Sequence, residues 1–467
     1  MPSDLWALED APAGAFEHQT LVFRRRMTLK DWEILRPYAA RVVTIRETIA
    51  FIHAEHRTKL SPLVCDALCH CPFPDLFPKL RKVDFFHPDE RHSRMIAFTL
   101  LGPQLRYVRL DDQKYLLRYA PKLGKICPLV KVFEAPRFAS KSEILLDLSE
   151  AVCSWNHLQS VSCGDVDEPM ISHLTTLTCL ESLSIHVTEE APWLTSRQFG
   201  AFKDLERLTL ATDSGTTAVR AVSRLLSNPS SPGVRANVAN IECESITPSS
   251  FLAFTTALAR VCSDDLESLS LSIEFAGVTR ADPGLSEHFN AFRALSPFRY
   301  LSSLRVDFED IPVSITGDQL LELAPSWPEL WSIQINTIEN PISLSALIKL
   351  IRVWPLATEV CIPTSITRAD TADVEASTKD IPEFKQIRRL SLDYEHEPRE
   401  GDADEDDELD QSTIPLVVTL LSRIAPRLSR IDPVNYGDEE DIYWDNVVTA
   451  IAGKRLKKKV KVQASST

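Results

Sequence analysis

Glycine is scarce in this sequence, with 13 residues among 467, and the loops that cradle phosphate groups depend on glycine. The chain contains no G-x-G-x-x-G, no G-x-x-x-x-G-K-[ST], no G-x-S-x-G and no H-E-x-x-H pattern. Their absence argues against a nucleotide-binding loop, a hydrolase nucleophile elbow and a zinc-protease site. The sequence therefore predicts a protein that is not an enzyme, with no catalytic residues, cofactor or metal.

Long hydrophobic runs are also missing, since no segment approaches the roughly 18 apolar residues that a membrane-spanning helix needs. The first residues, "MPSDLWALEDAPAG", are acidic where a secretory signal is basic and then apolar. The net charge of -15 argues against binding to nucleic acid or to anionic membranes. Ten scattered cysteines are typical of reduced, buried thiols. We therefore expect a cytoplasmic protein that binds neither nucleic acid nor membranes.

One pattern, L-x-x-L-x-L, is abundant, as in "LESLSL", "LESLSI", "LERLTL" and "LSSLRV". From Leu80 to Ile387 its first apolar positions are about 28 residues apart, near the upper end of the roughly 20–29 residues of leucine-rich repeats. A degenerate earlier copy begins at Ala40. We place these first positions at Leu80, Leu105, Leu129, Leu158, Leu180, Leu205, Val238, Leu266, Leu301, Leu330, Ala357, Ile387 and Leu428.

Each copy of the pattern alternates apolar and polar residues, which predicts a strand with one buried face. The segments between the copies predict helices: "TPSSFLAFTTALARVC" opens with Thr247 as N-cap and Pro248 at the first helical position. Strand–helix units of this length must stack on one another to form a core. We expect an α/β solenoid of irregular leucine-rich repeats, with parallel strands on the concave face and helices on the convex face. A doubly wound sheet is the alternative.

The repeats resemble those of F-box/leucine-rich-repeat proteins of mushroom-forming fungi. The resemblance is carried by "TLVFRRRMTLKDWEILRPYAARVVTI" (Thr20–Ile45), "FPKLRKVDF" (Phe77–Phe85), "GPQLRYVRL" (Gly102–Leu110) and "WPELWSIQI" (Trp327–Ile335). It implies a substrate receptor of an SCF-type ubiquitin ligase, with its adaptor and cullin as partners. The F-box itself is not recognisable, because only "PSDLW" stands before the first matching segment. Either the chain is truncated at its start or it lacks the adaptor-binding module.

The expected organisation has three parts. Residues 1–39 form an N-terminal capping segment that resembles the end of an F-box region, and residues 40–453 form the solenoid. Eight carboxylates in the eleven residues Glu400–Asp410 predict a solvated acidic insertion at 398–412. Residues 454–467 form a basic, polar tail, for which a nuclear import signal and a simple charged end remain equal alternatives.

At the start of the chain, Thr28 and Asp31 predict a capping box that opens a helix. Further on, "CDALCHC" (Cys65–Cys71) raises the possibility of a zinc site. Its apolar surroundings favour core packing instead.

The candidate binding residues are those between the buried positions of the early repeats. They combine aromatic side chains with both charge signs, as protein-interface hot spots do. Solvated strand residues without a function are the alternative. We expect a protein target, recognised on the concave face, to contact Lys82, Asp84, Phe86, Tyr107, Arg109, Asp111, Lys131 and Phe133. A stand-alone repeat scaffold with no ubiquitin role is the alternative function.

Overall fold

The computed structural model describes residues 4–10, 18–46, 57–73, 76–84, 100–110, 120–135, 142–195, 202, 204–226, 236–262, 265–275, 286–309, 312–336, 338–367, 383–394, 414–433 and 442–454. The chain divides into two compact units, Met1–Leu205 and Glu206–Thr467. Phe86, Asp111, the acidic insertion and all of the basic tail except Lys454 lie outside the described residues.

The first unit opens with a small three-stranded sheet. Its strands are β1 (Trp6–Asp10), β2 (His18–Phe23) and β4 (Arg57–Leu60); β1 pairs antiparallel with β2, and β2 pairs parallel with β4. Helices α1 (Leu29–Ala39) and α2 (Pro62–Cys69) follow β2 and β4. The boundary between the capping segment and the solenoid was expected between residues 39 and 40. It falls between β2 and β4, two strands that pair with each other.

The predicted capping box at the start of α1 is confirmed, with reciprocal bonds between Thr28 and Asp31. Trp32 of this helix is buried with Ala39 and Leu76. These contacts anchor α1 to the chain segment that leads into the first parallel strands.

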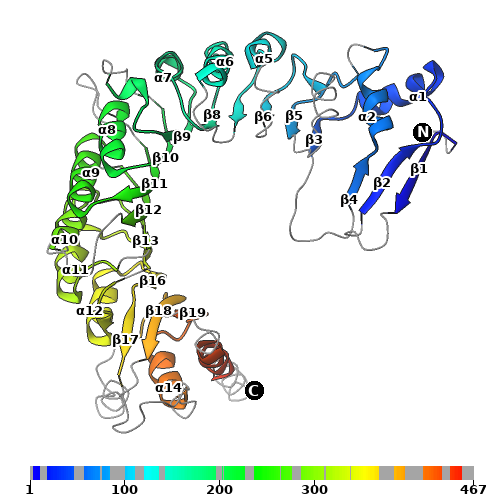
Figure 1. Cartoon of the computed structure of the whole chain (residues 1–467). Coiled ribbons are helices and arrows are strands. Elements are labelled where there is room, and N and C mark those ends of the chain that lie inside the picture. The colour runs from blue at the N-terminus through cyan, green and yellow to red at the C-terminus, as the bar shows by residue number, and fades with distance from the viewer. Residues whose placement is uncertain are drawn as a thin grey trace, which may run out of the picture. The chain divides into compact units, whose positions relative to one another are not determined.

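The rest of the first unit is a parallel sheet with strand order β3-β5-β6-β7-β8-β9. Figure 1 shows the helices of this part on one side of the strands. The elements are β3 (Thr44–Arg46), β5 (Lys82–Asp84), β6 (Tyr107–Arg109), α5 (Ala120–Ile126), β7 (Val132–Glu134), α6 (Ser142–Cys153), β8 (Ser160–Cys163), α7 (Glu168–Thr176), β9 (Ser182–Val187) and the 3-10 turn Pro192–Leu194.

The second unit repeats the alternation of strands and helices. Its parallel strands run in the order β10-β11-β12-β13-β14-β16-β18, with β19 and β17 also pairing with β18 and β15 with β17. The strands are β10 (Arg207–Thr212), β11 (Val238–Ile246), β12 (Ser268–Phe275), β13 (Ser303–Glu309), β14 (Ser332–Ile335), β15 (Ile342–Ser343), β16 (Glu359–Cys361), β17 (Thr364–Ile366), β18 (Arg389–Tyr394) and β19 (Arg430–Pro433). The helices are α8 (Gly215–Leu226), α9 (Pro248–Val261), α10 (Ser286–Arg293), α11 (Gly317–Leu323) with the 3-10 turn Ala324–Ser326, α12 (Leu344–Val353), α14 (Ile414–Ile424) and the helical segment 442–454.

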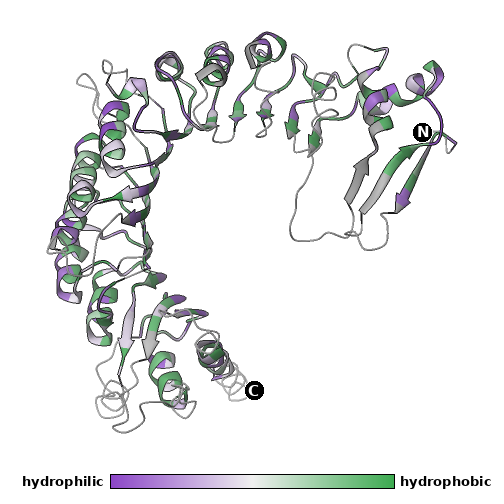
Figure 2. Ribbon diagram, in the orientation of Figure 1, coloured by the Kyte–Doolittle hydropathy of each residue, from purple (hydrophilic) through white to green (hydrophobic). Residues whose placement is uncertain are grey.

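Local sequence explains these helices. Thr247 caps α9 by accepting a hydrogen bond from the N–H of Ser250, and Pro248 is the first helical residue, as expected. Along α8 the buried residues include Ala218, Ala221, Val222 and Leu225, which share one helix face. Hydrophilic and hydrophobic residues accordingly alternate along α8–α11 (Figure 2).

The expected mixed α/β class with a large parallel sheet is therefore confirmed. Among the described residues, no helix is both long and apolar enough to cross a membrane.

Candidate functional site

The candidate site lies on β5, β6 and β7 of the first unit. The three strands pair in parallel register, so that Lys82 faces Tyr107 and Tyr107 faces Val132. Asp84, Arg109 and Glu134 form the second row of the same ladder. Residues at equivalent positions of a parallel sheet project from the same face, which places the two rows side by side.

The other face of these strands is the core. Val83, Val108 and Phe133 are each at most 3% exposed. The ring of Phe133 lies 5.2 Å from that of Trp155, two residues after the end of α6. The opposite face of the strands is therefore directed away from the helices. It carries Lys82, Tyr107, Arg109, Val132 and Glu134. We call it the strand face.

Direct contacts connect the three strands of the strand face. The ammonium of Lys82 lies 3.9 Å from the centre of the Tyr107 ring, a cation–π contact. The Tyr107 hydroxyl donates a hydrogen bond of 2.9 Å to Oε2 of Glu134, and Nε of Arg109 lies 3.8 Å from the same oxygen. These contacts hold an aromatic ring between charged groups of both signs, as in the centres of many protein interfaces.

The structure corrects two of the expected residues. Phe133 is fully buried, so its expected position on the exposed face is wrong. The buried first position of this repeat is Val130, at 0% exposed, whereas Leu129 is 36% exposed. A shift of one residue exchanges the two faces of a strand. Val132 and Glu134 therefore take the places that were expected for Lys131 and Phe133, and Lys131 precedes the strand.

Three other expected residues, Lys82, Tyr107 and Arg109, occupy the alternate positions of β5 and β6 that the sequence assigned to them, and Asp84 is the last residue of β5. Tyr107 is partly buried and Arg109 is exposed. Glu134 was not among the expected residues, although it accepts the Tyr107 hydrogen bond and lies beside the Arg109 guanidinium. Val130 is the residue that identifies Glu134. Alternate residues counted from Val130 are Val132 and Glu134, which assigns Glu134 to the exposed row.

Serine dominates the next strands of the first unit. Ser160 and Ser162 of β8 and Ser182 and Ser184 of β9 occupy the same two rows and are all partly buried. In the second unit, Ser268, Ser270 and Ser272 of β12 alternate with buried residues in the same way. Within the first unit, the short hydroxyls of β8 and β9 leave a low surface next to the larger side chains of β5–β7.

The second unit contains an ion network at its last strands. Arg389 lies 2.5 Å from Asp432 and 3.9 Å from Glu359, and Arg430 lies 2.7 Å from Asp432. Burial alone opposes ionisation of Asp432, but the hydrogen bond and charge of Arg389 outweigh it, so the pKa of this carboxyl is lowered. The network contains two positive and two negative side chains, so its formal charges balance.

The described cysteines are free thiols, and Cys127, Cys163, Cys243, Cys262 and Cys361 are buried. Burial raises the pKa of Cys127 to about 11 and that of Cys163, Cys262 and Cys361 to about 12. A thiol in such surroundings stays protonated near neutral pH and is a poor nucleophile. These cysteines serve as small core residues, as the sequence predicted.

The proposed zinc cluster falls partly outside the described residues, because the side chains of Cys65 and Cys69 are not described. Cys71 packs against the core around Trp32. His70 is exposed, and its Nδ1 lies 2.8 Å from the main-chain oxygen of Asp66. Cys71 therefore contributes to core packing, as expected for this residue, and the rest of the cluster is not tested.

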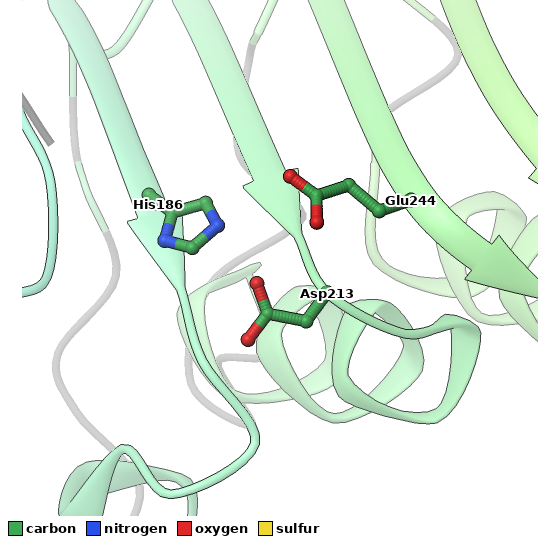
Figure 3. A group of neighbouring side chains, drawn as sticks. All are labelled: His186, Asp213 and Glu244. Atoms are coloured by element: carbon green, nitrogen blue, oxygen red, sulfur yellow. The ribbon is translucent and has the colours of Figure 1, made fainter. Parts of the chain in front are cut away.

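Three other residues with ligand atoms are drawn in Figure 3: His186 belongs to the first unit, whereas Asp213 and Glu244 belong to the second. In the first unit, Nδ1 of His186 lies 3.6 Å from Oδ1 of Asp165. In the second unit, the carboxylates of Asp213 and Glu244 approach within 4.8 Å. Among the residues that the structure describes, neither unit by itself brings three ligand atoms together at this point.

Comparison with known proteins gives no assignment: no protein-family model and no curated protein matches the chain.

Proposed function

We propose that this chain is a non-enzymatic, protein-binding solenoid of irregular leucine-rich repeats. The repeat type is supported by a constant offset between sequence and structure. Strands begin two residues after a buried first position, as at Leu80, Leu105, Leu266 and Leu330. A solenoid of this kind presents strand side chains as one continuous surface, which suits recognition of another protein better than catalysis.

The observation that carries the function is the composition of the strand face. Lys82, Tyr107, Arg109 and Glu134 present a ring and charges of both signs from three strands in register. Aromatic and arginine side chains supply most of the binding energy of protein interfaces. Contacts already present among them reduce the side-chain ordering that binding would require. A protein target that docks on this face would contact all four of these side chains.

The resemblance of Thr20–Ile45 to F-box/leucine-rich-repeat proteins extends this proposal. On that basis the strand face would hold a target for a ubiquitin ligase, in the cytoplasm or the nucleus, with the adaptor and cullin as further partners. This step rests on likeness of sequence pattern. The alternative is a stand-alone scaffold that binds the same target without a ligase.

Affinity purification of the tagged full chain from its source cells tests the proposal. The double variant Tyr107→Ala/Arg109→Ala alters the strand face, and Leu146→Ala/Glu150→Ala alters two exposed residues of α6 in the same unit. We expect a partner that is lost with the first variant and kept with the second. A set of partners that is unchanged by the strand-face variant would contradict the proposed site. Stoichiometric adaptor and cullin in the wild-type sample would support the ligase role, and their absence would favour the scaffold.

A further inference from the structure

A row of positive charges lies beside the strand face, at the residues that immediately precede β5, β6 and β7. These residues are Arg81, Arg106 and Lys131. The N–H of Arg106 donates to the oxygen of Arg81, and the N–H of Lys131 donates to the oxygen of Arg106, both at 2.8 Å. The main chain thus fixes the three residues at equivalent positions, with the usual spacing of about 4.8 Å between neighbouring strands.

No described carboxylate forms an ion pair with this row. Arg109, at the other end of β6, has Glu134 at 3.8 Å, whereas Arg81, Arg106 and Lys131 form no ion pair among the described residues. Arg81 and Arg106 are exposed and Lys131 is partly exposed. Like charges that lie next to each other across a sheet repel, so the row reduces the stability of the free protein.

The row is confined to the start of the ladder. The next two equivalent positions are Gln159 and Glu181, which donate to the oxygens of Lys131 and Gln159. In the second unit, the equivalent positions that precede β10 and β12 are Glu206 and Glu267. Three adjacent cations are therefore unusual within a chain whose net charge is -15.

We infer that Arg81, Arg106 and Lys131 bind an extended acidic segment of the protein partner. This inference rests on the proposed function and specifies the chemistry of the target. Three positions span two strand spacings, roughly 9.6 Å, which matches about three residues of extended peptide at about 3.3 Å per residue. Carboxylates from such a segment neutralise the repulsion within the row, and the guanidinium groups offer bidentate hydrogen bonds.

Fluorescence anisotropy with a labelled peptide that carries about four consecutive glutamates between glycine–serine flanks tests the inference. The same peptide with glutamines is the neutral probe. The row variant is Arg81→Gln/Arg106→Gln/Lys131→Gln. The control variant, Arg220→Gln/Arg260→Gln/Arg352→Gln, removes three exposed arginines from helices α8, α9 and α12, so that both variants lose the same charge.

We expect the wild type and the control variant to bind the glutamate peptide, and the row variant to bind it at least about tenfold more weakly. Binding should weaken as salt increases, because exposed charges are screened. Equal binding by the row and control variants, or equal binding of the glutamine peptide, would overturn the inference. Tighter, row-dependent binding of a single-stranded RNA oligonucleotide would also overturn it, by assigning the row to nucleic acid.

The test is separable from that of the proposed function. A partner whose capture depends on Tyr107 and Arg109 but not on the three basic residues would leave the strand face in place and reject the acidic segment. Circular dichroism checks that the row variant is folded. We expect it to fold because all three side chains are at least partly exposed.

Discussion

The indole N–H of Trp354 donates a hydrogen bond of 3.0 Å to the main-chain oxygen of Ala324. Trp327 donates in the same way to Leu295 at 3.2 Å, and Trp155 donates to Cys127 at 2.9 Å. Each bond joins a buried indole ring to the preceding pair of strand and helix, about 30 residues earlier in the sequence. These three tryptophans thus connect adjacent strand–helix pairs through a hydrogen bond as well as through packing.

Replacement of Trp354 by phenylalanine keeps an aromatic ring in the core and removes the donor. The oxygen of Ala324 is then left without this partner, and we expect the free energy of unfolding to fall by about 1–3 kcal/mol. Trp331→Phe is the matched control, because Trp331 is 44% exposed, and its effect should stay within about 0.5 kcal/mol. Urea denaturation measures both, and equal effects would argue against a role for the Trp354 bond.

Gly215, the first residue of α8, is a site where alanine should destabilise the fold. A Cβ at this position would collide with the side chain of Ile246 and lie 2.9 Å from Cβ of Ser250. Overpacking of this kind costs about 1–3 kcal/mol. Gly453 also lies in a helical segment, but a Cβ there meets nothing within 4 Å.

The thermal midpoints of Gly215→Ala and Gly453→Ala should therefore move differently. Gly215→Ala should lower the midpoint, and Gly453→Ala should leave it unchanged or raise it, because alanine favours helix by up to about 1 kcal/mol. A higher midpoint for Gly215→Ala would show that α8 and α9 do not approach each other as closely as described.

His288 predicts a dependence of stability on pH. Its side chain is fully buried and accepts a hydrogen bond from the N–H of Ser314 at Nδ1. Burial lowers the pKa of His288 below its ordinary value of 6.5, and the charge of Glu339 only partly opposes this. As the pH falls through 6.5, the unfolded chain takes up a proton that the folded chain resists, so stability is lost.

The variant His288→Gln can still accept the Ser314 hydrogen bond but does not titrate. We expect the wild type to lose more stability than the variant between about pH 7.5 and pH 5.5, by up to about 1.4 kcal/mol per pH unit below the unfolded pKa. Identical pH profiles, measured by urea denaturation, would show that His288 does not contribute to the pH dependence.

Thr28 tests the start of the first unit. Its hydroxyl donates to Oδ2 of Asp31 at 2.7 Å, and its N–H donates to the same oxygen at 2.8 Å. The Arg25 guanidinium, together with these donors, holds the pKa of the Asp31 carboxyl well below its usual range. Thr28→Ala should destabilise the fold by about 1 kcal/mol, whereas Thr28→Ser should retain most of the stability. Equal losses in the two variants would mean that the hydroxyl is not the feature that matters.

Sequence patterns predict the strands well because the buried first positions are chemically distinctive. The degenerate copy at Ala40 is misplaced by two residues, because Val43 is the residue equivalent to Arg81. Of the thirteen later first positions, two are wrong. At "PLVKVF" both Leu129 and Val130 are apolar, and composition alone cannot decide which is buried; the wrong choice exchanged the faces of β7. At β11 the buried first position is Ala236 rather than Val238, which faces Arg207 of β10. Alanine is less apolar than valine, so the L-x-x-L-x-L pattern favours Val238 at this point.

Other features depend on contacts that a one-dimensional pattern does not contain. The pairing of β2 with β4 joins segments on both sides of α1, and β4 is only four residues long. Glu134 gains its place in the site from Tyr107, 27 residues earlier. The capping box of Thr28 and Asp31 was predictable because it is local.

The most direct test of the strand face as a protein-binding surface is site-specific photo-crosslinking of the full chain to its purified partner. A photoreactive residue replaces Val132 on β7 or, as the control, Leu146 on α6. We expect a crosslinked product from position 132 and none from position 146. A product from position 146 alone would place the partner on the helices and contradict the account.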